Sequence, residues 1–192
     1  IFLILAVFTI GLAILTALVI PDHELTNDSP KNKNYKMSDQ FHDLMTIYSD
    51  RFFWKIAVIT LLHGGVFLSY QALWMGPWLA DVAGQSQDEV ANSMLVFNIG
   101  MLVGVIGIGI IADKIQNIGI GLITVVRAGV VLSLIFQIFI AAEFTSLAKL
   151  LCAGFGFFGS STLLVYALLG QTYPSHMVGK VNTAQNMLIF IS

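Results

Sequence analysis

Residues 90–112 read VANSMLVFNIGMLVGVIGIGIIA, an apolar stretch without a charged residue. As an α-helix it extends about 33 Å, at about 1.5 Å per residue, and the hydrocarbon core of a bilayer is about 30 Å thick. The stretch therefore predicts a helix that spans a membrane.

Other stretches of the same character lie on both sides of it. They are residues 1–20, about 52–83, about 118–142, about 147–169, and 178–192. Overall, 57% of the 192 residues are hydrophobic, only 10% are charged, and the mean hydropathy is +0.85. A soluble domain carries about 25% charged residues. We predict an all-α fold, a polytopic transmembrane helix bundle.

The same composition excludes several classes of protein. A net charge of −2 excludes nucleic-acid binding through a basic surface, and a single cysteine excludes a disulfide-stapled secreted module. The apolar content excludes a disordered chain. No His-Glu-x-x-His or Walker-type motif occurs, so the sequence predicts no metal, no cofactor and no use of ATP.

Charged residues gather in residues 21–51, which predict a polar loop between a first helix (1–20) and a bundle (52–192). The loop begins with residues typical of coil. It then shows an apolar pattern at helical spacing, which predicts a short amphipathic helix lying along the membrane surface, with Ser38 or Asp39 as N-cap. The apolar residues of this pattern are Phe41, Leu44, Met45 and Tyr48.

The distribution of Lys and Arg predicts the orientation. One side of the membrane receives seven of these residues, and the other receives only Lys149. Because cytoplasmic loops carry the excess of positive charge, we expect the loop 21–51 to be cytoplasmic. The seven are Lys31, Lys33, Lys36, Arg51, Lys55, Lys114 and Lys180.

Both ends of the sequence fall inside apolar runs. Residue 1 is an Ile without a basic segment before it, and residues 178–192 reach only about 22 Å as a helix. We expect the sequence to be a piece of a longer protein, cut within a helix at each end.

A short motif lies where the span 90–112 meets the next connection. Gly109-Ile-Ile-Ala-Asp113-Lys114 resembles the cytoplasmic Gly-x-x-x-Asp-Arg/Lys signature of the major facilitator superfamily, although Gln116-Asn117-Ile118-Gly119 replaces the usual continuation. Gly109 would let two helices approach closely, and Asp113 would cap the next helix or meet an Arg of the other half.

The layout of the chain resembles the same family. One helix, a long cytoplasmic loop and a bundle with short loops are similar to spans six to eleven of twelve, where the second half begins. Tyr173-Pro174 with Gly179-Lys180 resembles the connection between the tenth and eleventh spans. The resemblance implies a secondary transporter that works with an N-terminal half, in the bacterial inner membrane, with Gly109, Asp113 and Lys114 at a cytoplasmic gate.

Polar residues within the spans are the candidates for a solute site, because such residues are costly in a membrane. His63, Phe67, Tyr70 and Trp74 share one helical face, with Gln71 beside them, and would suit a solute cavity. The imidazole of His63 would carry a coupling proton. Alternatively, His63 bonds a neighbouring helix and the aromatic rings only pack.

Two features of the spans allow two interpretations each. Gly76-Pro77 should kink or end the regular helix, either at a gate or at an ordinary interfacial end. Arg127, about 14 Å beyond Ile118, is expected near mid-bilayer. It would bind an anionic solute or pair with a carboxylate of the missing half, or else it snorkels towards the cytoplasm.

Amide side chains complete the candidate set. Asn182, Gln185 and Asn186 recur at spacings of three and four and should face one direction, and Asn98 lies in the span 90–112. Each can contact a solute or join two helices. Glycines give the spans 90–112 and 147–169 small surfaces that permit tight packing.

The predicted function is secondary active transport of a small solute by alternating access, with protons as the expected coupling ion. The main alternative is a membrane bundle that transports nothing, such as a sensor or an assembly protein. An intramembrane serine protease is a remote alternative, because Ser160 has only His176 after it and that His lies in a connection.

Overall fold

The computed structural model describes residues 2–19 and 37–191. The coil predicted before the amphipathic helix lies outside these residues. The chain divides into two units, residues 1–38 and residues 39–192. The first contains α1 (Phe2–Val19), an apolar helix without a charged residue, in which the Thr16 hydroxyl donates to the carbonyl oxygen of Leu12 at 2.8 Å.

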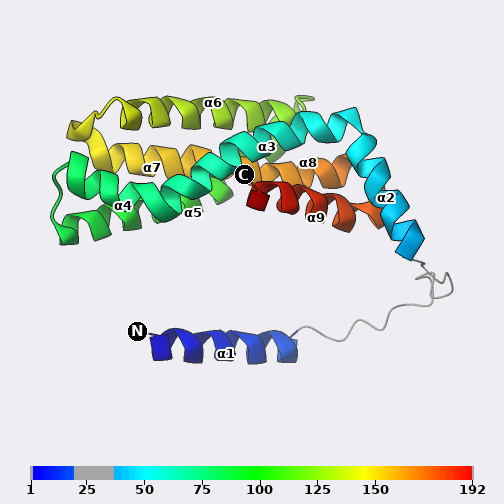
Figure 1. Cartoon of the computed structure of the whole chain (residues 1–192), viewed down its shortest axis with the longest axis horizontal. Helices are drawn as coiled ribbons and strands as arrows, with labels where there is room; N and C mark the ends of the chain where they lie inside the picture. Colours follow the sequence, from blue (N-terminus) through cyan, green and yellow to red (C-terminus); the bar gives the residue numbers. More distant parts are fainter. Residues whose placement is uncertain (1, 20–36, 192) are drawn as a thin grey trace. The chain divides into compact units, whose positions relative to one another are not determined.

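The second unit is a bundle of helices (Figure 1). A short helix, α2 (Met37–Ser49), leads into it. Four helical stretches that follow are long and apolar enough to cross a membrane, namely Arg51–Val82, Gln87–Asn117, Leu122–Ala141 and Thr145–Thr172. No strand occurs in the described residues. These four stretches correspond to the second to fifth predicted spans, and the all-α membrane bundle is confirmed.

The four stretches contain several elements. Arg51–Val82 comprises α3 (Arg51–Ser69), η1 (Tyr70–Trp74), α4 (Met75–Pro77) and η2 (Trp78–Val82). The next two are α5 (Gln87–Asn117) and α6 (Leu122–Ala141). The fourth comprises η3 (Thr145–Leu147), α7 (Ala148–Gly159), η4 (Ser160–Leu163) and α8 (Leu164–Thr172), and α9 (Ser175–Ile191) follows it.

Local chemistry explains where the helices begin. Asp50 caps α3, because its carboxylate accepts the backbone N–H of Phe52 at 2.8 Å. At the start of α5, the carboxylate of Glu89 accepts the backbone N–H of Ser86 at 2.9 Å, which is half of a capping box. Gly119, with φ of +84°, makes the turn between α5 and α6, and few other residues adopt this conformation.

Gly76-Pro77 alters the helix without ending it. The segments before and after α4 are π-helical, and the backbone N–H groups of Met75 and Ala83 donate to the carbonyl oxygens of Tyr70 and Trp78, five residues earlier. Proline offers no N–H and its ring crowds the preceding turn, so wider turns accommodate it here. The predicted interruption of the regular helix is confirmed, and the helical path continues to Val82.

Glycines bring α5 and α7 into backbone contact. A Cβ added at Gly100 would lie 2.4 Å from the carbonyl oxygen of Ala153, and one at Gly104 would lie 2.3 Å from that of Phe157. From the other side, a Cβ at Gly156 would lie 2.4 Å from the carbonyl oxygen of Phe97. No side chain fits between the two helices at these positions. The tight packing expected of the glycine-rich spans is therefore confirmed for this seam.

α7 and η4 also use small residues against two other helices. A Cβ at Gly154 would lie 2.1 Å from the ring of Phe136 on α6, and one at Gly159 would lie 2.1 Å from the ring of Phe67 on α3. On α6, Gly129 lies directly against Ser161, whose hydroxyl oxygen would be 2.2 Å from an added Cβ. The stretch α7–η4 is therefore the element on which α3, α5 and α6 all pack.

The amphipathic helix is present as α2, with two differences from the prediction. It begins at Met37, so Ser38 and Asp39 lie inside the helix and neither is its N-cap. The side chain that anchors it is Ile47, which is fully buried in a core cluster with Phe53, whereas Phe41 and Met45 are exposed. Ile47 lies three residues after Leu44 and faces the bundle, so the buried stripe is rotated from the predicted one.

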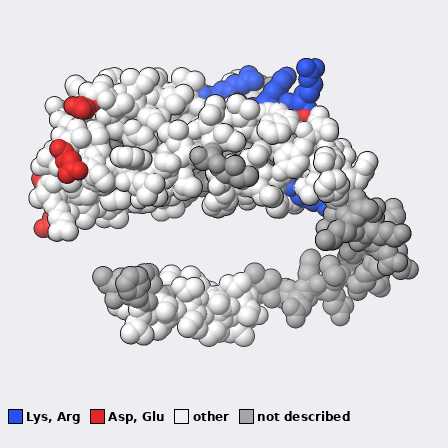
Figure 2. Space-filling view, viewed as in Figure 1, with Lys and Arg blue, Asp and Glu red and all other residues white. Residues whose placement is uncertain are grey.

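Charges separate along the bundle. Figure 2 shows Lys and Arg gathered towards one end, while most of the Asp and Glu visible in that view lie towards the other. Arg51 and Lys55 begin α3, and Lys114 lies in the last turn of α5, whose first turn contains Asp88 and Glu89. The positive end fits the predicted cytoplasmic side. The orientation itself stays a prediction.

The α5–α7 seam gives a first prediction. Gly104→Ala should lower the stability of the bundle by about 1–3 kcal/mol, because the added methyl group meets backbone that has no room to move. Thermal unfolding of the purified full-length protein in detergent measures this effect. Gly109→Ala is the matched control on the same helix, since its Cβ would meet nothing within 4 Å. Equal melting temperatures for the two variants would contradict the close backbone contact between α5 and α7.

Candidate functional site

His63 is a buried imidazole without a hydrogen-bond partner. It lies on α3 with 6% of its surface exposed, and neither ring nitrogen has a hydrogen-bond partner in the described part of the chain. The ring stacks on Phe67, with centroids 6.2 Å apart and an interplanar angle of 15°. Phe67 in turn packs against Gly159 and against the ring of Phe155.

Gln185 is a second buried polar residue without a hydrogen-bond partner. It lies on α9, is fully buried, and neither atom of its amide has a partner among the described residues. The amide oxygen of Asn182, one turn earlier, also has no hydrogen-bond partner among the described residues. α9 packs beside α3, where a Cβ at Gly64 would lie 3.9 Å from Ile189. Two neighbouring helices thus supply polar atoms that have no partner inside the protein, which is uncommon in folded proteins.

The aromatic stripe predicted on α3 divides into two parts. His63 is buried and Tyr70 is half-buried, with its ring edge-on to Phe155 at 5.7 Å, but Trp74 is 62% exposed. The π-helical segment Tyr70–Trp74 changes the angle per residue, so Trp74 leaves the face that His63 occupies. Gln71 is half-buried beside them.

Two hollows lie beside the exposed part of the stripe. One, of about 370 Å³, is lined by Tyr70, Trp74, Pro77, Trp78, Asp81 and Val82. The other, of about 450 Å³, lies between α3 and α6, where Gln137 faces it together with Ser69, Tyr70 and Trp74. His63 lines neither of these hollows.

The remaining amides differ from the expected arrangement. Asn186 is exposed and accepts a hydrogen bond from the Tyr166 hydroxyl, whereas Gln185 points into the bundle. The prediction that Asn182, Gln185 and Asn186 face one direction is therefore wrong for Asn186, because the three span the border between a buried and an exposed face. Asn98 is exposed, and its amide nitrogen donates to the carbonyl oxygen of Met94 at 2.7 Å within its own helix.

Arg127 lies closer to the start of its helix than expected. α6 begins at Leu122, so Arg127 is about 8 Å along the helix and not about 14 Å. It is exposed and lines a hollow of about 610 Å³ with Arg51, Trp54, Lys55 and Val58. Ile118 and Ile120, which suggested an earlier start, belong to the turn between α5 and α6. Arg127 thus lies in the second turn of α6, and the structure does not join it with His63. Its depth in the bilayer stays a prediction.

The expected gate residues lie near the end of α5. The helix continues to Asn117, past the expected end near Ala112, and α6 has Gly121 as its N-cap without a side-chain bond. Asp113 therefore does not cap the next helix. Asp113 and Lys114 are exposed, and a Cβ at Gly109 would meet open space, so Gly109 mediates no close approach between the described helices.

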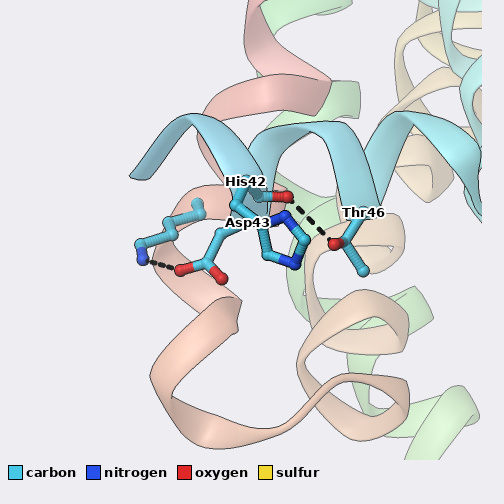
Figure 3. A network of polar contacts seen from close by, with 4 residues as sticks. His42, Asp43 and Thr46 are labelled. Atoms are coloured by element: carbon cyan, nitrogen blue, oxygen red, sulfur yellow. Dashed lines mark hydrogen bonds and ion pairs between the residues drawn. The ribbon is translucent and has the colours of Figure 1, made fainter. Parts of the chain in front are cut away.

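Two polar contacts that the sequence did not predict hold α2 and the start of α3 against the rest of the bundle. Lys180 on α9 forms an ion pair with Asp43, and the Tyr173 hydroxyl donates to Asp50, the residue that caps α3. Figure 3 shows Asp43 reaching away from its own helix, while Thr46 bonds back to the carbonyl oxygen of His42. Partial burial and the bond to Asp50 raise the pKa of Tyr173. The sequence did offer one signal for the role of Asp50, because an Asp directly before an apolar run is typical of a helix N-cap.

Together these features define a class of protein. It is a multi-pass helical membrane protein, with membrane-length helices packed through glycines and polar side chains left unpartnered within the bundle. The chain belongs to the Major Facilitator Superfamily, whose family profile matches residues 1–192. It is thus a membrane transporter, and the family implies a small-molecule solute and a lipid bilayer. No curated protein and no solved structure matches the chain.

The contact between α2 and α9 gives a pH-dependent prediction. The hydrogen bond from Lys180 lowers the pKa of Asp43, so the ionised carboxylate favours the folded arrangement. Because the pKa of Asp43 is lower in the folded than in the unfolded protein, the ionised carboxylate stabilises the fold at pH values above its unfolded pKa, about 4. This stabilisation is lost as the pH falls through the pKa of the folded protein. A double-mutant cycle of Asp43→Asn and Lys180→Gln, measured by thermal unfolding, should show coupling at pH 7 that declines as the pH falls below the unfolded value and protonates Asp43. Coupling that persists in acid would contradict the ion pair.

Proposed function

We propose that this chain forms part of a secondary active transporter that moves a small solute by alternating access, with a proton as the coupling ion. The observation that carries the proposal is the set of unpartnered polar atoms on α3 and α9. Both nitrogens of His63 and both amide atoms of Gln185 are shielded from solvent without a hydrogen bond to the described residues. Leaving such a group unpaired costs about 1–3 kcal/mol.

A transporter gives these atoms a use. Solute binding, or contact with residues of an N-terminal half, would supply the missing partners during part of the cycle. Gln185 and Asn182 offer amide donors and acceptors, which suit a solute with hydroxyl, carbonyl or amine groups. His63 is the proposed proton carrier, because an imidazole can gain and lose a proton in the physiological pH range.

Other residues have secondary roles in this proposal. Tyr70, Gln71 and Trp74 line or neighbour the hollows on the other side of α3, and would form the entrance to the solute path. The π-helical turns around Pro77 provide a place where the helix can bend during the exchange of states. Asp113 and Lys114 remain proposed gate residues, because both are exposed at one end of the bundle where an N-terminal half could meet them.

The role of His63 can be tested by separating coupling from binding. In proteoliposomes containing the full-length protein, a panel of metabolites and drugs is first screened for uptake driven by a pH gradient. His63→Gln should reduce gradient-driven accumulation about tenfold, because the proton carrier is gone, while solute exchange without a gradient stays within about twofold. Ser133→Ala, which removes a different buried and unpartnered hydroxyl on α6, is the control and should leave both rates unchanged.

Two outcomes would refute parts of the proposal. Equal loss of accumulation and exchange in His63→Gln would show that His63 does not act as the coupling group. Absence of flux for every solute, from protein shown to be folded, would favour a bundle that transports nothing.

Gln185 gives a second, independent prediction. Gln185→Leu has a similar volume and removes two unpartnered polar atoms, so it should stabilise the protein by about 1 kcal/mol. Transport should fall strongly in the same variant, because the solute loses its amide partner. Melting temperature and flux are measured on the same preparation. A destabilised protein would mean that Gln185 has a structural partner, and unchanged transport would remove it from the site.

A further inference from the structure

The hollow at the start of α3 gathers cations without anions. Arg51, Lys55 and Arg127 line it, and all three side chains are exposed. Arg51, Trp54, Lys55 and Val58 follow one another at helical spacing, so α3 contributes one continuous face, and α6 contributes Arg127. Figure 2 shows that this end of the bundle carries most of the visible positive charge.

No carboxylate among the described residues lines this hollow. None forms an ion pair with Arg51, Lys55 or Arg127. The acidic residue next in sequence is Asp50, and both of its oxygens already accept hydrogen bonds, one from the Phe52 backbone and one from Tyr173. Three neighbouring cations repel one another, so the arrangement favours an anion that all three can reach.

The rest of the hollow indicates what kind of anion. Trp54 is 42% exposed and Val58 is 49% exposed, so apolar surface continues from the cations along α3. The Trp54 indole is fixed, because its N–H donates to the carbonyl oxygen of Tyr48 at 2.7 Å. Tryptophan beside Arg and Lys at the end of a membrane span is typical of the headgroup region of a bilayer.

We propose that this hollow binds the phosphate headgroup of an anionic phospholipid, with Arg51, Lys55 and Arg127 around the phosphate. Trp54 and Val58 would lie against the glycerol and the first part of an acyl chain. The apolar surface next to the cations favours a lipid over a free anion, which would leave Trp54 and Val58 uncovered. A basic hollow between membrane helices is a recognised form of lipid site. This inference does not depend on the proposed solute site.

Trp54 itself can report on the occupant. The full-length protein is placed in phosphatidylcholine nanodiscs that contain increasing fractions of phosphatidylglycerol with brominated acyl chains, and tryptophan fluorescence is recorded. The signal of Trp54 is the difference between the protein and its Trp54→Phe variant. We expect quenching that saturates at a low fraction of brominated phosphatidylglycerol, and only weak quenching when phosphatidylcholine is the brominated lipid.

Variants test the role of the cations. Arg127→Gln and Lys55→Gln should each weaken the apparent affinity for phosphatidylglycerol about fivefold, since each cation near the membrane surface contributes comparably. Lys149→Gln is the matched control, because Lys149 is exposed on α7 and lines a different hollow with Gln85. Unfolding temperatures measured alongside show that each variant is folded.

Three results would overturn the proposal. Equal quenching by the two brominated lipids would show that headgroup charge is not recognised. Displacement of the lipid by an excess of inorganic phosphate would indicate a site for soluble anions. Arg127→Gln binding that equals that of Lys149→Gln would mean that Arg127 is paired elsewhere in the full-length protein, for example with a carboxylate of another segment.

Discussion

The backbone contact between α5 and α7 is the constraint on which the bundle depends. Lipid tails are as apolar as the side chains they surround, so membrane helices associate through close packing and not through the hydrophobic effect that drives soluble folding. Gly100, Gly104 and Gly156 remove the side chains that would otherwise separate the two helices. The gain is dispersion contact along the whole seam, and a single added methyl group has no space to occupy.

The position of the candidate site follows from this seam. Because α7 lies against α5, its remaining faces are available to α6 and α3, and Gly159 provides the surface on which Phe67 rests. Phe67 in turn holds the ring of His63. A glycine on one helix thus makes room for the ring that stacks on the imidazole of another. The polar residue is placed by packing alone, since no hydrogen bond within the described residues holds it.

The sequence predicted the fold because apolar stretches of membrane length allow few alternatives to a helix. Its errors concern rotation and depth. Hydropathy does not distinguish a span from an apolar turn, so Ile118 and Ile120 moved the expected start of α6 and placed Arg127 too far along the helix. Helical spacing assumes a constant angle per residue, and the π-helical turn at Tyr70–Trp74 broke that assumption for Trp74. The prediction missed Ile47 because the stripe Phe41, Leu44, Met45 and Tyr48 contains more apolar residues than the helical face around Ile47. Packing against the bundle decides which face of α2 is buried.

α3 contributes residues to both proposed sites, and their spacing along this helix keeps the sites apart. Arg51 and Lys55 lie in its first two turns, whereas His63 is about 18 Å beyond Arg51 at the helical rise. The first site is open to its surroundings and is built from charge. The second is closed and is built from His63, Asn182 and Gln185, so the proposed proton on His63 requires a partner or water to reach the imidazole during the cycle. A lipid phosphate at the start of α3 would therefore neutralise the end of the helix without competing for the solute. It would also tie that end to the headgroup region, leaving the π-helical turns beyond Ser69 as the part of the span that is free to bend.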